Sequence, residues 1–113
     1  MAMAAVAFPV LPGKAEDGRR FAQEVMERRQ EAAAAWRRQG TTREWWFLQA
    51  TPAGEMVIVV LESADPQKAF QIWAASTDPY DVWFKERAGS ICGIDFNQPI
   101  PALPEQLLEW AAD

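Results

Sequence analysis

The stretch from Thr41 to Ser63 constrains the fold more than any other part of this sequence. It reads TTREWWFLQATPAGEMVIVVLES, two strand-like runs joined by the turn residues Thr51-Pro52-Ala53-Gly54. The first run carries paired tryptophans and a phenylalanine, and the second is almost entirely β-branched or aliphatic. Both faces of the predicted hairpin are therefore apolar and need to be covered. We expect helices on one face and a partner subunit or a ligand on the other.

The residues before this hairpin predict a strand and a long helix. Ala4–Val10 is predicted as a strand that ends at Leu11-Pro12-Gly13, because proline and glycine in succession do not continue a ladder. Glu16–Arg38 is rich in strong helix formers and in opposite charges four residues apart, which predicts one continuous helix. Gly40 is expected to end that helix.

The residues after the hairpin predict two short helices, a short strand and a last helix. Asp65-Pro66 and Asp78-Pro79 each place an aspartate N-cap before a proline at the first helical position, so a helix should begin at each. Ile94-Asp95-Phe96 is the remaining place for a fourth strand. A final short helix is expected through Leu107, Leu108 and Ala111.

This order of elements predicts an α+β fold of the ferredoxin-like type, βαββαβ, with a four-stranded antiparallel sheet and an extra C-terminal helix. The length of 113 residues fits a single domain over residues 1–113. One face of such a sheet stays bare, and here that face would carry tryptophan, phenylalanine and valine. Apolar area on that scale marks an interface, so we expect a homodimer that packs the two sheet faces together.

Charge and hydropathy indicate a cytoplasmic protein that binds neither nucleic acid nor a membrane. The net charge is −5, and the pairs Arg19-Arg20, Arg28-Arg29 and Arg37-Arg38 recur every nine residues, so successive pairs face opposite sides of a helix. No apolar run approaches the roughly 20 residues that span a bilayer. The first basic residue, Lys14, follows the apolar N-terminal segment, which is the wrong order for an export signal. A single cysteine, Cys92, fits a reducing compartment.

The chain resembles the dimeric α/β-barrel superfamily, which includes antibiotic-biosynthesis monooxygenases and stress-responsive barrel proteins, and within it a small bacterial family of uncharacterised proteins. The resemblance implies two ferredoxin-like sheets packed face to face as a barrel. The residues that carry it are Pro12-Gly13-Lys14, Arg28-Arg29, Thr42-Arg43-Glu44 with Trp46, Leu48, Gln49, Thr51 and Pro52, and Asp78-Pro79 with Asp81, Trp83 and Phe84.

Several kinds of chemistry are excluded by composition. The chain has no histidine, which removes the histidine-dependent catalytic triads and the usual histidine ligation of zinc, iron or haem. Gly13 and Gly18 stand in no phosphate-binding frame, and no acidic pair is spaced as a metal site. Cys92 has no histidine to activate it and is interpreted as a buried structural residue. We therefore expect neither a metal nor a cofactor.

Arg29 is a candidate ligand-binding residue. On a continuous helix it falls near the middle of the arc set by Phe21, Val25, Ala32 and Trp36, where a guanidinium needs a partner. Glu44 is the most available acid. The alternatives are a structural ion pair, an arginine whose head reaches the helix edge, or an anchor for a ligand carboxylate.

The aromatic strand offers two sets of residues to the barrel interior, because neighbouring side chains alternate between faces. One set is Trp45, Phe47 and Gln49; the other is Glu44, Trp46 and Leu48. We favour the first set as ligand-binding residues, since an amide suits a pocket better than a core. These aromatic side chains could also simply fill space.

Tyr80 and Asp81 are the best acid/base candidates, although Asp81 near a helix N-terminus also has a structural use.

Two classes of function fit these patterns. The first is a dimeric binding protein that holds a small, largely apolar molecule in an aromatic cavity. The second is a cofactor-independent monooxygenase or isomerase, which rests on the resemblance. A barrel filled by its own tryptophans would instead indicate a purely structural dimer. An open, wet cavity with a buried acid of raised pKa would favour the enzyme.

Overall fold

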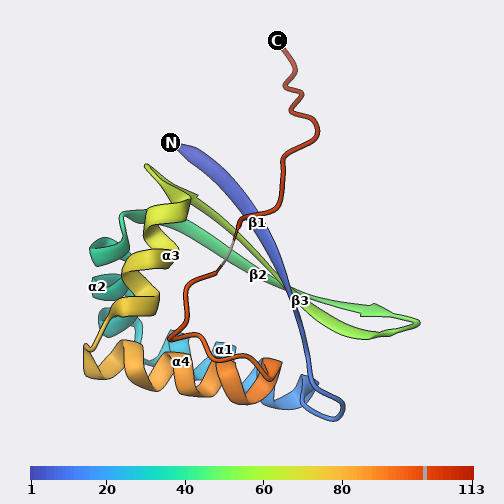
Figure 1. The fold of residues 1–113 in the computed structure, drawn as a ribbon, viewed down its shortest axis with the longest axis vertical. Coiled ribbons are helices and arrows are strands. Elements are labelled where there is room, and N and C mark those ends of the chain that lie inside the picture. The colour runs from blue at the N-terminus through green and yellow to red at the C-terminus, as the bar shows by residue number, and fades with distance from the viewer. Residues whose placement is uncertain (101) are drawn as a thin grey trace.

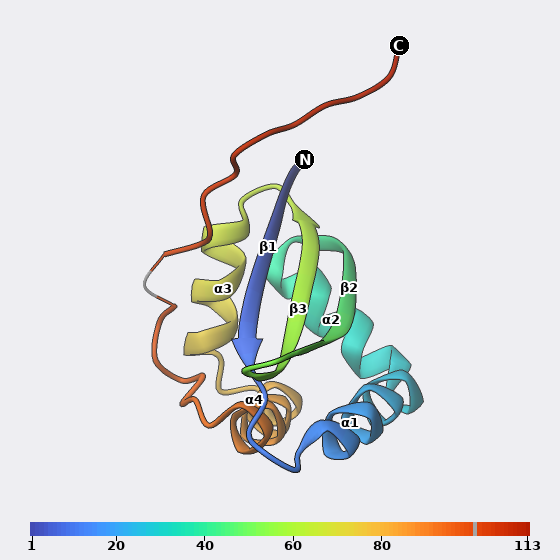
Figure 2. The same cartoon turned by 90° about the vertical axis from the view of Figure 1, so that its right-hand side faces the viewer.

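The computed structural model describes residues 1–100 and 102–113, and it has two layers, a sheet and a set of helices on one of its faces (Figures 1 and 2). In chain order the elements are β1 (Ala2–Pro9), α1 (Ala15–Glu27), α2 (Arg29–Gln39), β2 (Thr41–Thr51), β3 (Gly54–Ser63), α3 (Pro66–Ala75) and α4 (Pro79–Cys92). The predicted α+β class, the first strand and the hairpin are confirmed. None of the helices in the described part of the chain is long and apolar enough to cross a membrane.

The sheet has three antiparallel strands in the order β1-β3-β2. Trp46 on β2 pairs with Val59 on β3, which in turn pairs with Val6 on β1. These three positions lie on the face that the helices cover, because Val6 is buried and Trp46 packs against the helical core. The alternate positions lie on the bare face, and they include Ala5, Ala7, Trp45, Phe47, Ile58 and Val60.

The predicted fourth strand at Ile94-Asp95-Phe96 is wrong. These residues form a turn in which the Asp95 carboxylate accepts a hydrogen bond from the Asn97 backbone N–H at 3.0 Å. Phe96 is buried, with its ring centroid 5.1 Å from that of Phe8 and 5.2 Å from that of Trp73. Phe96 therefore packs into the core beside the sheet, and its segment does not add a strand to the sheet. The sheet has three strands instead of the four of a ferredoxin-like fold.

The predicted C-terminal helix is also absent from residues 102–113. That segment runs as an extended tail away from the body of the domain (Figures 1 and 2), and Leu107, Leu108 and Trp110 are 88%, 82% and 80% exposed. Isolated helices shorter than about 12–15 residues are marginal in water unless an apolar face is packed. In residues 102–113 the apolar side chains that a helix would bury are exposed to solvent.

The predicted long helix over Glu16–Arg38 is divided into α1 and α2. The break falls at Arg28, whose backbone angles of φ −96° and ψ 40° leave the helical region. The sequence offers no glycine or proline here. The guanidinium of Arg28 lies 4.3 Å from the centroid of Trp83 and 5.0 Å from that of Tyr80, so the break accompanies contacts to α4.

Both predicted aspartate caps are confirmed. The Asp65 carboxylate accepts from the Lys68 backbone N–H at 3.1 Å, and the Asp78 carboxylate accepts from the Tyr80 backbone N–H at 2.9 Å. The second of these caps fixes the start of α4, and with it the positions of Tyr80 and Asp81.

Candidate functional site

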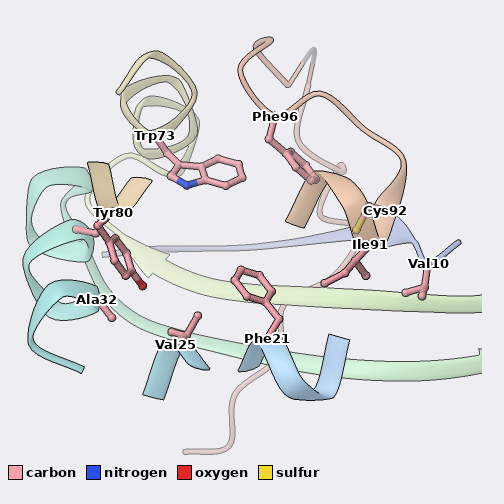
Figure 3. Close-up of a cluster of buried hydrophobic side chains, with 10 residues drawn as sticks. Val10, Phe21, Val25, Ala32, Trp73, Tyr80, Ile91, Cys92 and Phe96 are labelled. Carbon is pink, nitrogen blue, oxygen red and sulfur yellow. The ribbon is translucent and has the colours of Figure 1, made fainter. Parts of the chain in front are cut away.

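A cavity of about 270 Å³ lies between the covered face of the sheet and the helices. Figure 3 shows part of its surroundings, where Phe21 from α1, Trp73 from α3 and Tyr80 from α4 converge over the strands. The rings pack at angles to one another: the centroid of Phe21 lies 5.5 Å from that of Trp46 and 4.9 Å from that of Phe84. A cavity with an aromatic wall and a few polar groups is the usual form of a small-molecule site.

Glu44 is the acidic side chain that β2 contributes to this cavity. The alternation of the strand places it on the covered face together with Trp46, and the indole N–H of Trp46 donates to the Glu44 carboxylate at 2.8 Å. Burial raises the pKa of Glu44, and hydrogen bonds from Trp46 and Trp36 offset part of that rise. A carboxyl group with a raised pKa that lines a cavity is a candidate general acid or base.

Asp81 lies at the first turn of α4 and is 2% exposed. Its Oδ2 accepts hydrogen bonds from Arg38 Nη2 at 3.0 Å and from Ser76 Oγ at 2.6 Å. Its Oδ1 is buried and has no hydrogen-bond partner within the part of the chain that the structure describes. Asp81 is therefore held firmly on one side and keeps a free acceptor on the other.

Tyr80 precedes Asp81 and is 5% exposed. Its hydroxyl is also buried without a hydrogen-bond partner among residues 1–100 and 102–113, and Figure 3 shows this oxygen directed into the interior of the cluster. Burial, together with the negative charges of Asp81 and Glu44, raises the pKa of Tyr80 to about 12. The hydroxyl therefore stays protonated at neutral pH and can donate or accept a hydrogen bond.

The polar network behind Asp81 includes residues that sequence reasoning missed. Lys85 is 3% exposed, and its ammonium donates to the carbonyl oxygens of Ala74 and Ser76, each at 2.9 Å. Burial lowers the pKa of Lys85, and the charge of Asp81 opposes that shift. The spacing of four residues from Asp81 is the signal that could have found Lys85, since it places both on one side of α4.

The structure places Arg29 away from this site. The break at Arg28 changes the phase of the helix, so Arg29 begins α2 as an exposed residue. The predicted burial of Arg29 is therefore wrong, and Glu44 accepts its hydrogen bond from Trp46. The guanidinium of its neighbour Arg28 instead lies over the rings of Tyr80 and Trp83.

By the alternation of β2, Trp45, Phe47 and Gln49 lie on the bare face, although Phe47 also borders the cavity together with Glu44, Trp46 and Leu48. The guanidinium of Arg43 lies 4.5 Å from the centroid of Trp45, Phe47 is 54% exposed, and the Gln49 side chain donates to the Ala50 carbonyl at 2.9 Å. The aromatic cavity of the subunit is thus built mainly from the other set of the strand. A ligand-binding role for these three residues stays a prediction that concerns the bare face.

Cys92 is confirmed as a buried residue. Burial raises the pKa of its thiol to about 11, which suppresses the nucleophilic thiolate. Within the described residues, no three histidine, cysteine, aspartate or glutamate side chains are grouped so that they could hold a metal ion.

These features define a small α+β protein with an aromatic internal cavity that contains two carboxyl groups and a tyrosine. The chain belongs to a family described as a "Family of unknown function (DUF6176)", which matches residues 1–100. No curated protein and no solved structure matches it. The family match includes every helix and strand and all the polar residues of the cavity.

Proposed function

We propose that this protein binds a small, largely apolar molecule in the internal cavity. The observation that carries the proposal is the pair of unpartnered polar atoms, Tyr80 Oη and Asp81 Oδ1, on side chains that are more than nine-tenths buried. A buried polar atom without a hydrogen bond costs about 1–3 kcal/mol. A ligand that pairs with these atoms and covers the aromatic wall recovers that free energy.

Filling the cavity should abolish binding. Ala35 on α2 lines the cavity, and Ala35→Leu adds three carbon atoms to its wall. The neutral probe N-phenyl-1-naphthylamine should gain fluorescence with the parent protein, because its emission rises in an apolar site, and should lose most of that gain with Ala35→Leu. Circular dichroism shows whether the variant is folded.

The control for this test is Ala33→Leu, which makes the same change on the same helix at a position outside the cavity lining. It should leave the fluorescence gain unchanged. If the parent does not bind the probe, or if both leucine variants bind it equally, the ligand does not occupy this cavity.

We also infer that the protein is a homodimer in which the bare sheet faces pack together as a dimeric α/β barrel. The bare face carries Trp45, Phe47, Ile58 and Val60 in adjacent cross-strand positions. Contiguous apolar area of this kind supports a protein interface. The same face holds the residues for which the sequence predicts a role inside a barrel.

A second candidate function is a cofactor-independent isomerase, and the raised pKa of Glu44 in the same cavity as Tyr80 favours it. The Glu44 carboxylate would take a proton from the carbon next to a ketone, and Tyr80 would donate a hydrogen bond to the enolate oxygen. In a ketone with a neighbouring carbon–carbon double bond, the proton then returns from Glu44 to the far carbon of that double bond while the carbonyl re-forms, so the double bond moves and the carboxylate is regenerated.

Deuterium exchange tests this activity. In heavy water the protein should accelerate deuterium incorporation into 2-tetralone, followed by NMR, and Glu44→Gln should reduce the rate by about 100-fold. The rate should rise with pH through the raised pKa of Glu44, because only the ionised carboxylate accepts a proton. An equal rate for the parent and Glu44→Gln would contradict the isomerase reading.

A further inference from the structure

The ionisable side chains that face into the cavity are acidic. Glu44 and Asp81 line it from opposite layers, one from the sheet and one from α4. The one basic side chain among its lining residues, Arg19, is exposed, and its guanidinium is bound to Glu16 at 3.1 Å. No positive charge is therefore directed into the cavity by the residues that line it.

The two carboxyl groups differ in how their charges are balanced. Asp81 is paired with Arg38 through Oδ2, which leaves Oδ1 as a free acceptor. Glu44 receives a neutral hydrogen bond from Trp46, and the ion pairs of the described residues involve other carboxylates. An ionised Glu44 in this apolar surrounding thus lacks a positive partner, which is why burial dominates its raised pKa.

The walls of the cavity add a second feature that suits a positive charge. Trp36, Trp46, Trp73, Tyr80 and Phe84 all line it. The faces of aromatic rings attract cations, most strongly in sites that exclude water. Aromatic walls together with an unbalanced carboxyl group are the elements of an ammonium site.

We propose that the ligand is an apolar amine, whose ammonium group lies between Glu44, Asp81 Oδ1 and Tyr80 Oη and whose hydrocarbon body fills the aromatic cavity. This inference rests on the proposed binding function and specifies its ligand class. The ammonium group supplies three donors, and these three side chains supply three acceptors. A carboxylic acid ligand is disfavoured, because its charge would face two acidic residues and the negative faces of the rings.

Four adamantane derivatives of one shape test the head group: adamantylmethylamine, adamantylmethanol, adamantane carboxylate and methyladamantane. They absorb no light above 280 nm, so tryptophan emission and thermal stability both report their binding. The amine should bind the parent protein about tenfold or more tightly than the alcohol, since a charge-assisted hydrogen bond is roughly twice as strong as a neutral one. The carboxylate should bind most weakly.

Glu44→Gln keeps the shape of the side chain and removes its charge. It should abolish the preference for the amine over the alcohol while both still bind. The matched control, Glu86→Gln, removes one exposed charge from α4 outside the cavity and should keep the preference.

The outcomes separate the two proposals. If the alcohol or the carboxylate binds the parent as tightly as the amine, the cavity is a ligand site but not an ammonium site, and the present inference fails alone. If none of the four compounds binds, the inference fails. If Ala35→Leu also leaves probe binding unchanged, the proposed function fails with it.

Discussion

In the homodimer proposed above, replacing Phe47 by aspartate should separate the two subunits. Phe47 is 54% exposed in the single subunit and lies in the middle of the apolar bare face. A carboxylate at the centre of a packed apolar interface is desolvated without a partner, so we expect the dissociation constant to rise about 100-fold or more, as for a central interface residue. Light scattering should change from twice the chain mass of 12.7 kDa to that mass itself.

Met26 provides the control for this substitution. It is 56% exposed on α1 and lies on a helix, away from the bare face of the sheet. Met26→Asp introduces the same charge at an exposed apolar residue and should leave the mass unchanged. A parent protein that is monomeric at micromolar concentration, or a Phe47→Asp variant that stays dimeric, would contradict the face-to-face arrangement.

Removing the guanidinium of Arg38 should lower the free energy of unfolding by about 2–3 kcal/mol. Breaking a buried ion pair from one side costs about 3–5 kcal/mol, and the partial exposure of Arg38 reduces that figure. Asp81 is 2% exposed, so Arg38→Met leaves its carboxylate with the Ser76 hydroxyl and no ion-pair partner at Oδ2. Urea unfolding measures the loss.

The neighbouring arginine gives a matched comparison. Arg37 is exposed on the same turn of α2, and Arg37→Met should change stability by less than about 0.5 kcal/mol. A double-mutant cycle between Arg38→Met and Asp81→Asn should give a coupling energy above about 0.5 kcal/mol. Independent effects of the two substitutions would mean that the ion pair does not stabilise the fold.

Local chemistry accounts for the parts of the fold that could be predicted from the sequence. The hairpin follows from β-branched and aromatic runs on either side of a turn, and the starts of α3 and α4 follow from an aspartate and a proline that satisfy the first helical N–H groups. Each of these signals lies within a few residues of the structure it specifies.

The parts that could not be predicted depend on contacts between distant residues. Ile94-Asp95-Phe96 has the composition of a strand, but Phe96 is buried against the rings of Phe8 and Trp73, which lie far from it in the sequence. The break at Arg28 has no breaker residue and accompanies contacts to Tyr80 and Trp83. Helical periodicity over one continuous helix therefore assigned Arg29 to the core.

The candidate site could be predicted only in part, because it also depends on contacts between residues that are distant in the sequence. The sequence indicates Glu44, Tyr80 and Asp81 as candidate site residues, and the structure brings them to one cavity. The partners of Asp81, Arg38 and Ser76, lie 43 and 5 residues from it in the sequence. Only the packing of α2 on α4 brings Arg38 to Asp81. The side of β2 that faces the helices could not be predicted from alternation alone, because each set combines a tryptophan and a second apolar side chain with one polar residue.

The strand order β1-β3-β2 has a consequence for the order of assembly during synthesis. β1 ends at Pro9, and its partner strand β3 begins at Gly54. A ribosome that adds about 5–20 residues per second needs roughly 2–9 s to make the chain between them. The hairpin of β2 and β3 forms from local contacts. β1, in contrast, stays unpaired until β3 has been synthesised. Four of the eight residues of β1 are alanine, which has a low β-propensity, so the unpaired strand has a low tendency to aggregate.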